Sequence, residues 1–286
     1  MTVLGFIKNW INRGLKPFNM SLISLTAERA EAARLLALEQ SGHFNQPIFP
    51  LLPQFARCDP TLVLDAVARH KSSINRFCSP RANNGYSFSN DYFTSSDAEV
   101  AYALVQQLKP QHIIEVGSGN STKLFREAIT DGKLSTKLVS IDPSPRTPID
   151  PIADRVIKQR LEWVSPSFFN EILSCDDILF IDSSHEIRIG NDVLNLLLTI
   201  VPALKNGVVI HIHDIFLPFE YPREWVVVNK WDMFKEQYLV QAMLQDCEKY
   251  DVLWPGHFLQ RTLPGFSEHF SVPHQLAASL WLRKRS

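Results

Sequence analysis

The sequence predicts an α/β protein built on a Rossmann-like, doubly wound sheet that is mostly parallel. Two observations lead to this fold class. Short apolar runs rich in Ile and Val follow one another from residue 112 onward, and helical or turn-rich stretches separate them. Apolar runs without alternation are typical of strands buried on both faces, as in a parallel sheet covered by crossover helices. The expected strands span residues 112–116, 138–141, 156–158, 178–181 and 208–212.

Helical signals precede and follow these strands. Ser96 offers an N-cap with Asp97 and Glu99 in the first turn, so we expect a helix from there to Leu108. The elements expected nearer the C-terminal end are a helix over residues 231–249 and strands over residues 250–254 and 279–283.

The first part of the chain has a different pattern. Ile7, Trp10 and Ile11 recur at helical spacing, which predicts an amphipathic first helix. A stretch rich in Ala, Glu and Leu predicts a second helix over residues 26–40, and prolines and turn formers predict loops after it. The expected parts of the chain are a helical N-terminal extension over residues 1–92 and an α/β domain over residues 93–286.

The charge balance argues against nucleic acid as the principal partner. The 286 residues include 29 Lys and Arg against 30 Asp and Glu, a formal net charge of −1. A protein that grips a phosphate backbone carries a basic excess instead. With 45% hydrophobic and 21% charged residues, the composition is that of a globular protein and not of a disordered one.

Cysteine usage and apolar runs bear on the cellular compartment. The four cysteines, Cys58, Cys78, Cys175 and Cys247, form neither a C-x-x-C pair nor a dense disulfide framework. We expect four reduced thiols in a cytoplasmic protein. No apolar run reaches the ~18 residues that a bilayer span needs, so no transmembrane segment is expected. The N-terminal stretch also lacks the pattern of a secretory signal.

A glycine-rich turn follows the first expected strand. The sequence from Glu115 to Asn120 reads Glu-Val-Gly-Ser-Gly-Asn, and a helix follows it. Glycines let the backbone turn tightly beside a ligand, and a helix N-terminus offers free N–H groups. The second strand ends at Asp142, 23 residues beyond Gly119, where a carboxylate can accept both hydroxyls of a ribose. Binding of a nucleoside cofactor is the prediction, and a tight turn with a solvated aspartate is the alternative.

The spacing Glu115-x-Gly117-x-Gly119 resembles the first motif of class I S-adenosylmethionine (SAM)-dependent methyltransferases. The dinucleotide fingerprint has a third glycine where this chain has Thr122. The resemblance to the methyltransferases covers roughly residues 93–286.

This resemblance implies how the cofactor is held. The glycine loop passes under the methionine part of SAM, Asp142 holds the ribose, and Glu162 contacts the adenine. The last two strands form an antiparallel C-terminal hairpin. The implied cofactor-binding residues are Glu115, Gly117, Ser118, Gly119, Asn120, Asp142 and Glu162.

Polar residues end the fourth and fifth expected strands. They are Asp182 and His185 after the fourth, and His211, His213 and Asp214 at the fifth. Because ligands of such sheets sit beyond the carboxyl ends of the strands, these side chains should share one crevice. A histidine beside a carboxylate suits removal of a proton from a nucleophile, and paired carboxylates can instead hold Mg²⁺. We expect His211 and His213 to point to opposite faces of the sheet, with His211 in a structural role.

A further resemblance concerns these strand ends. Asp182-x-x-His185, followed by His213-Asp214 and by a Pro-x-x-Tyr-Pro stretch, is similar to the type-24 methyltransferase domains and to the macrolide-sugar O-methyltransferases. The resemblance implies that Asp182 and Asp214 bind Mg²⁺ and that His185, beside Asp182, is the catalytic base. The chain departs from the sugar enzymes at His213, which replaces the first acid of an acidic pair. Nitrogen is a poor ligand for Mg²⁺, so the metal stays open here.

Three other stretches each have more than one interpretation. Residues 216–225, which are aromatic and rich in proline, suit a lid over a hydrophobic or sugar-like acceptor, or an ordered packed loop. Glu236, Gln237 and Tyr238 can face the acceptor or form a solvated helix face. The first helix can pack on its own domain or on a second subunit, which leaves a homo-oligomer open; peripheral membrane contact is the weaker idea.

The sequence as a whole predicts a SAM-dependent methyltransferase that O-methylates a small molecule or glycan at a His/Asp site, with Mg²⁺ open as a second cofactor. Two alternatives come from other classes of protein. One is an NAD-type oxidoreductase, against which Thr122 argues. The other is a non-catalytic SAM-binding partner protein, against which the pair of Asp182 and His185 argues.

Overall fold

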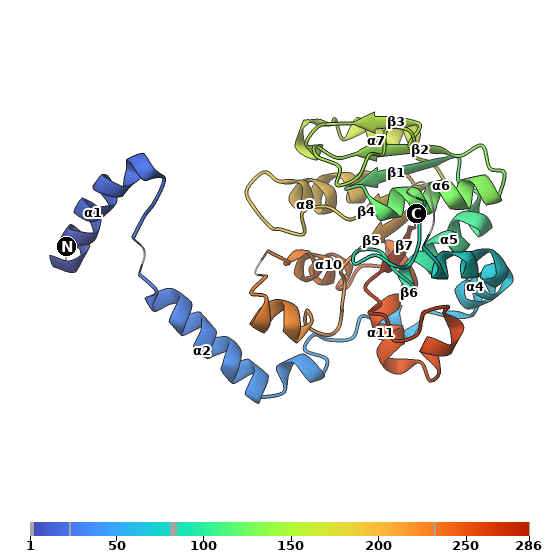
Figure 1. Cartoon of the computed structure of the whole chain (residues 1–286). Helices are drawn as coiled ribbons and strands as arrows, with labels where there is room; N and C mark the ends of the chain where they lie inside the picture. The colour runs from blue at the N-terminus through green and yellow to red at the C-terminus, as the bar shows by residue number, and fades with distance from the viewer. Residues whose placement is uncertain (1–2, 23, 81–84, 232, 286) are drawn as a thin grey trace. The chain divides into compact units, whose positions relative to one another are not determined.

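A computed structural model gives the structure of the chain and describes residues 3–22, 24–80, 85–231 and 233–285 (Figure 1). The chain forms two compact units. One comprises residues 1–46 and 222–230, and the other comprises residues 47–221 and 231–286. Among the described residues, no helix combines the length and the apolar character that a membrane crossing requires.

The smaller unit is helical. The helices α1 and α2 span Val3–Leu15 and Thr26–Gln40, which confirms the two helices expected there. Short helical turns follow each of them, and the π-helical segment η6, Glu224–Val228, belongs to the same unit. An ion pair between Glu39 and Arg223, with 2.5 Å between Oε1 and Nε, connects α2 to the residues just before η6.

The larger unit is built on a seven-stranded sheet in the order β3-β2-β1-β4-β5-β7-β6. The strands β1 to β5 are parallel, and β7 runs antiparallel to both β5 and β6. This arrangement confirms the predicted fold class, including the antiparallel C-terminal hairpin. The strands are β1 His112–Val116, β2 Lys137–Ile141, β3 Arg155–Ile157, β4 Ile178–Ile181, β5 Val209–Ile212, β6 Tyr250–Pro255 and β7 Leu280–Lys284.

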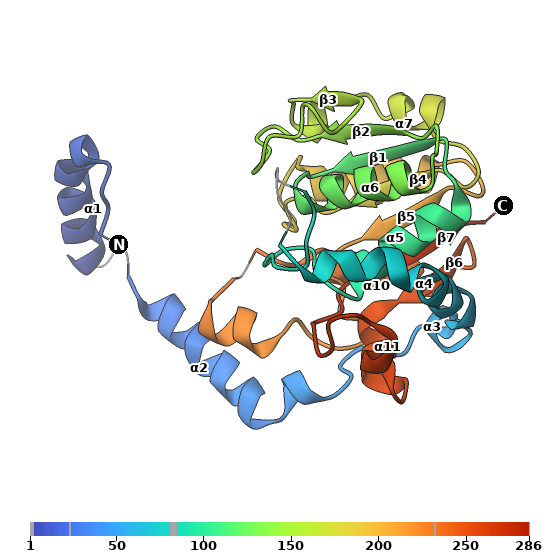
Figure 2. The same cartoon turned by 45° about the vertical axis from the view of Figure 1, so that its right-hand side comes forward.

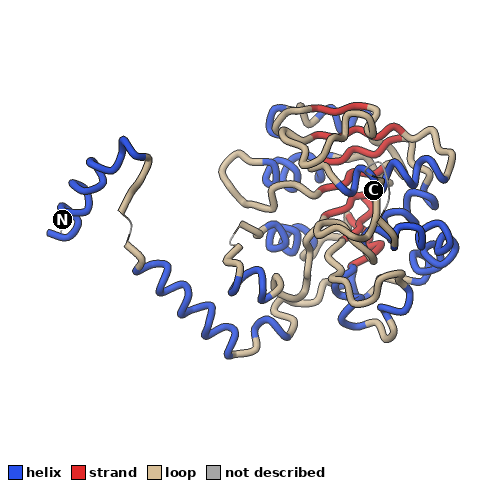
Figure 3. Tube along the Cα trace, in the orientation of Figure 1, coloured by secondary structure: helices blue, strands red, loops and turns tan. Residues whose placement is uncertain are grey.

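Helices cover both faces of this sheet (Figures 1 to 3). Ile113 packs in one buried cluster with residues of α4, α5 and α6, whereas Ile114 packs in a second cluster with residues of η5, α9 and α10. Because successive side chains of a strand point to opposite faces, a strand such as β1 contributes to both clusters. The helical segments of this unit are α3 Pro53–Ala56, α4 Thr61–Ile74, η3 Asn75–Cys78, α5 Asp97–Leu108, α6 Asn120–Asp131, η4 Leu161–Trp163, α7 Ser167–Ile172, α8 Asp192–Asn195, η5 Leu196–Ile200, α9 Val201–Ala203, α10 Glu236–Leu244, α11 Gly256–Thr262 and η7 Phe266–His269.

The expected boundary at residue 92 does not coincide with the division into units. Val63 and Val67 of α4 are buried in the same cluster as Ala101 of α5, so α4 is part of the core of the larger unit. That unit begins at Pro47. A helix that buries its apolar side in the core of a domain cannot be separated from it by composition alone.

Two local expectations were wrong. Ser96 has φ +63° and its side chain makes no capping bond to α5; the neighbouring Ser95 Oγ donates instead to Glu99 at 2.6 Å. The helix expected over residues 231–249 covers Glu236–Leu244 alone among the described residues, and position 232 lies outside them. The four cysteines are free, as expected.

Candidate active site

The glycine loop between β1 and α6 passes directly over the end of β4. Gly117 has φ +81°, and a Cβ atom there would lie 1.8 Å from the main-chain oxygen of Asp182. Glycine alone has no Cβ and adopts a positive φ without cost, so this contact requires it. At Gly119, by contrast, a Cβ would meet no atom within 4 Å.

Glu115, on β1, anchors this loop by hydrogen bonds. Its carboxylate is fully buried and accepts hydrogen bonds from the hydroxyls of Ser121 and Thr122, the second at 2.5 Å. Thr122 Oγ1 in turn accepts from the N–H of Gly119 at 3.0 Å. Burial raises the pKa of Glu115 to about 8, although the two hydroxyls oppose the shift. Glu115 therefore organises the loop and does not line the cavity beside it.

Asp142 directly follows β2, and Glu162 lies in the loop region after β3. Asp142 Oδ2 accepts from the N–H of Ser118 at 2.9 Å and from its hydroxyl at 2.8 Å, while Oδ1 accepts from the N–H of Ser144. The carboxylate of Asp142 thus connects the end of β2 to the glycine loop. Glu162 lies in η4, after β3, and is half-buried.

A cavity of about 420 Å³ opens beside the loop. Five of its lining residues were not predicted as site residues from the sequence, and one of them, Arg146, places its guanidinium 4.7 Å from the centre of the Tyr92 ring. Arg146 and Thr147 follow β2 closely, so the strand-end rule that identified Asp142 extends to them. The lining residues are Tyr92, Phe93, Ser118, Gly119, Asn120, Ser121, Arg146, Thr147 and Asp182. A larger hollow of about 620 Å³ around α11 and η7 contains none of the strand-end residues.

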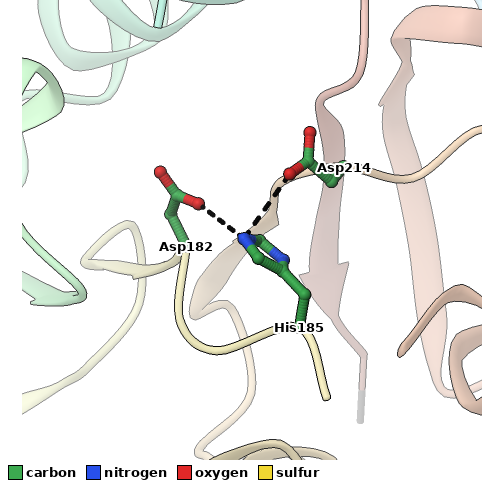
Figure 4. A group of neighbouring side chains, drawn as sticks. All are labelled: Asp182, His185 and Asp214. Atoms are coloured by element: carbon green, nitrogen blue, oxygen red, sulfur yellow. Dashed lines mark ion pairs between the residues drawn. The ribbon is translucent and has the colours of Figure 1, made fainter. Parts of the chain in front are cut away.

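Asp182, His185 and Asp214 meet at the ends of β4 and β5 (Figure 4). His185 Nε2 lies 3.2 Å from Asp182 Oδ1 and 3.5 Å from Asp214 Oδ2. One ligand atom from each residue lies within 4.8 Å of the others, so the three side chains could hold a metal ion together. The expectation that polar side chains from the two strand ends lie close together is confirmed, although Asp182 is the one among them that lines the cavity.

His213 lies beside the same carboxylates. Its Nδ1 is 3.3 Å from Asp214 Oδ1 and 3.8 Å from Asp182 Oδ1, and its Nε2 is 3.5 Å from Asp97 Oδ2. Asp97 also accepts from the backbone N–H groups of residues 278 and 279. Asp97, which the sequence places in the first turn of a helix, therefore also contacts a residue of the site.

The charges of the cluster are mutually dependent. Burial acts against the charged form of His213, but Asp214 and Asp182 outweigh it and raise its pKa to about 10. Burial also opposes ionisation of Asp182, yet His213 and His185 hold the pKa of that carboxyl below its usual value. Burial prevails at Asp214, where it raises the pKa despite both imidazoles. The two imidazolium groups thus balance carboxylates that would otherwise repel one another.

The expected orientation of His211 was wrong. Residues two apart on a strand point to the same face, and the rings of His211 and His213 are 5.7 Å apart. His211 stacks on Phe180 with 4.0 Å between ring centres, and its Nε2 lies 2.8 Å from Ser279 Oγ. Burial and the neighbouring His213 lower the pKa of His211 well below its usual value, so this ring is neutral and packs in the core.

The stretch after β5 and the first turn of α10 are packed. Phe216 and Tyr221 are at most 2% exposed, with ring centres 5.6 Å apart, which favours an ordered loop over a lid for this part of residues 216–225. Glu236 and Gln237 are buried as well, so a solvated helix face was the wrong interpretation for both, while Tyr238 is exposed. The carboxylate of Glu236 contacts Nδ1 of His185.

Part of the chain matches a known protein family. Residues 114–215 match the protein family described as "Methyltransferase domain". No curated protein sequence matches the chain. The family match confirms the resemblance to class I SAM-dependent methyltransferases and to the type-24 branch.

Solved structures of similar proteins include a methyltransferase of Podospora anserina, PaMTH1, bound to SAH, with 16% identity and a TM-score of 0.42 over 93% of this chain and 100% of that one. An O-methyltransferase of Bacillus cereus in complex with SAH has 13% identity and a TM-score of 0.39, over 89% of this chain and 100% of that one. The O-methyltransferase TomG of Streptomyces achromogenes, in complex with SAM, has 12% identity and a TM-score of 0.41, over 78% of this chain and 90% of that one.

Proposed function

We propose that this SAM-dependent methyltransferase transfers a methyl group to a hydroxyl oxygen of a small molecule or glycan, where Asp182, His185 and Asp214 meet. The position of His185 Nε2, 3.2 Å from Asp182 Oδ1 and 3.5 Å from Asp214 Oδ2, carries the proposal. Asp182 also lines the cavity beside the glycine loop. One residue thus belongs both to the cavity and to the acid–base cluster, which supports reaction at their junction.

On this proposal SAM binds in the cavity. Two features of the chain fit it: the open space at Gly119, and Thr147 Oγ1 on the cavity wall, which is buried without a hydrogen-bond partner among the described residues. Asp142 holds the ribose and Glu162 contacts the adenine. Bound SAM supplies an electrophilic methyl group on a sulfonium, so the chain has to align a nucleophile and remove its proton.

His185 is the base of the proposed reaction. Its Nε2 is the ring atom that faces the junction, because Nδ1 is engaged by Glu236. Burial acts against protonation, but Glu236, Asp182 and Asp214 raise the pKa of His185 well above its usual value. His185 has to lose its own proton before it can accept one from the acceptor hydroxyl. A bound cation near Asp182 and Asp214 would lower the pKa of His185, because it would offset the negative charges that stabilise the imidazolium.

Asp182 and Asp214 are the proposed ligands of a divalent cation such as Mg²⁺. One carboxylate oxygen of Asp182 lies within 4.8 Å of one of Asp214, so the two side chains are close enough to share one ion. A cation there lowers the pKa of a bound hydroxyl and orients it. His213 adds a ring nitrogen next to this point, which could bind a cation only after the loss of its proton, and imidazole suits Zn²⁺ better than Mg²⁺.

Two measurements test the proposal. Calorimetric titration compares SAM with NADH, and we expect SAM alone to bind. Transfer of a labelled methyl group from SAM is then followed over a panel of sugar, phenol and other hydroxyl acceptors, with release of S-adenosylhomocysteine as the readout. His185→Ala should bind SAM but release S-adenosylhomocysteine far more slowly than wild type. SAM binding without release in wild type, over the whole panel, would favour a non-catalytic partner protein.

A further inference from the structure

Three consecutive residues, the last of which begins α10, contact His185 in three different ways. The ring of Phe234 stacks on the imidazole, with 4.9 Å between ring centres and an angle of 21° between planes. The N–H of Lys235 donates to the main-chain oxygen of His185 at 3.0 Å. The carboxylate of Glu236 contacts Nδ1. We call Phe234, Lys235 and Glu236 the His185 clamp.

We propose that Glu236 is a positioning residue that fixes the ring of His185, with Nε2 turned toward Asp182 and Asp214. The inference rests on the proposed function, in which that nitrogen takes part in methyl transfer. A carboxylate that accepts a hydrogen bond from Nδ1–H selects the tautomer and sets the plane of the ring. The other nitrogen is then free to face a proton donor or a metal ion.

The contact between Glu236 and His185 is strengthened by the burial of both side chains. Glu236 is 1% exposed, and the side chain of His185 is 12% exposed. A carboxylate buried at this depth is costly unless it is paired and hydrogen-bonded, and in a weakly polar setting the hydrogen bond to an imidazole is strong. At a buried position an apolar residue would stabilise the helix as well as a glutamate or better. Stability alone therefore does not explain the presence of Glu236.

The clamp is itself anchored beside β5. Gln237 Oε1 accepts from the N–H of Phe216 at 3.0 Å, and the N–H of Gln237 donates to the hydroxyl of Tyr221 at 3.1 Å. The first turn of α10 is thereby joined to the segment that follows Asp214. His185 and Asp214 both have positive φ, +59° and +58°. A residue other than glycine keeps a positive φ only where several contacts hold it in that conformation, and the clamp supplies such contacts for His185.

The test needs no acceptor. Protein labelled with ¹⁵N-histidine is examined by long-range ¹H–¹⁵N NMR in wild type, Glu236→Gln and the control Glu248→Gln; His185→Gln assigns the signals. Glu248 is an exposed glutamate paired with Arg57, so the control makes the same chemical change away from the site. We expect a protonated Nδ1 on His185 in wild type and in the control. In Glu236→Gln that proton should exchange with water about tenfold faster or more.

Two results would overturn the inference. One is a wild-type His185 protonated at Nε2 alone, which decides the matter even where Glu236→Gln fails to fold. The other is an unchanged exchange rate in a folded Glu236→Gln, with folding checked by circular dichroism.

Activity gives a second readout once an acceptor is known. Glu236→Gln should lower kcat about 10- to 100-fold with the KM for SAM unchanged, as the loss of an outer carboxylate does at other histidines. Glu236→Asp, which keeps the charge, should recover part of the loss. Full kcat in Glu236→Gln contradicts the inference. If wild type transfers no methyl group to any acceptor, the proposed function fails. The NMR experiment still tests the role of Glu236 in that case, because it needs no acceptor.

Discussion

Gly117 and Asp182 are in backbone contact: a single carbon added to the glycine would lie 1.8 Å from the aspartate's main-chain oxygen. The N–H of Asp182 also donates to the oxygen of Val116 at 2.9 Å. The loop beside the cavity and the strand end that carries the candidate acid–base residues are therefore one rigid structure. A change in the backbone at one must move the other.

This contact predicts opposite outcomes for the two glycines of the loop. Gly117→Ala should destabilise the fold, because it combines a positive φ with a collision against backbone, a cost of roughly 1–3 kcal/mol or more for the strained conformation alone. Gly119→Val should leave the free energy of unfolding nearly unchanged, because a Cβ at this position would meet no atom within 4 Å. It should nevertheless abolish SAM binding, because that space is on the cavity wall.

Denaturant unfolding and calorimetric titration with SAM separate these outcomes. Unchanged SAM affinity in Gly119→Val would falsify the placement of the cofactor beside the loop. Asp142→Ala serves as the companion variant: loss of its proposed contacts with the ribose should weaken binding by about 1.5–3 kcal/mol per charged hydrogen bond.

The buried carboxyl of Glu115 predicts how stability depends on pH. Its pKa is about 8 in the folded protein against an ordinary value of 4.5, so the folded state holds a proton that the unfolded state releases between these values. The contribution of this group to stability is complete below pH 4.5 and is lost as the pH rises to about 8. The loss is at most about 1.4 kcal/mol per pH unit.

Glu115→Gln isolates this effect. The variant has no proton to release, so its free energy of unfolding should decline less than that of wild type between pH 5 and pH 8 (about the range between the two pKa values). At about pH 8.5 the variant should be the more stable of the two. Parallel stability curves for the two proteins would show that Glu115 is already ionised in the fold.

The strands of this fold were predictable because their pattern is local. The expected strand over residues 178–181 coincides with β4, and the expected strand over residues 208–212 begins one residue before β5. Short apolar runs between helical stretches are typical of the strands of a buried parallel sheet. The positions of Asp182 and Asp214 at neighbouring strand ends followed from the same rule.

The surroundings of the site were not predictable, because they come from distant parts of the chain. Glu236 lies 51 residues beyond His185, and no spacing in the sequence connects them. The periodicity of residues 231–249 indicates helix throughout, whereas Phe234 and Lys235 are held by His185 before the helix begins. Asp97 has the position of a helix-start acid in the sequence, yet in the fold it contacts His213.

The proposed base predicts a loss of turnover without a loss of cofactor affinity. His185→Ala should lower kcat by ~10²–10⁴, the usual contribution of general-base catalysis, while the affinity for SAM stays that of wild type. His274→Ala is the matched control, because His274 is exposed and lines the other hollow. Turnover of His185→Ala at the wild-type rate on the identified acceptor would assign His185 a structural role.

The metal is tested by removing it and by weakening one of its proposed ligands. If a cation bound to Asp182 and Asp214 is essential, EDTA should stop methyl transfer, and Mg²⁺ or Mn²⁺ should restore it. Asp214→Asn keeps one ligand oxygen but loses its charge, so it should need a higher metal concentration for half-maximal activity. The alternative is that the imidazolium groups of His213 and His185 neutralise the aspartates, as their distances of 3.3 Å (to Asp214) and 3.2 Å (to Asp182) allow. In that case EDTA has no effect. Activity should then rise as the pH is raised toward the elevated pKa of His185, because the ring must lose its proton before it can act as the base. Full activity in chelator would end the metal hypothesis and leave the role of His185 intact.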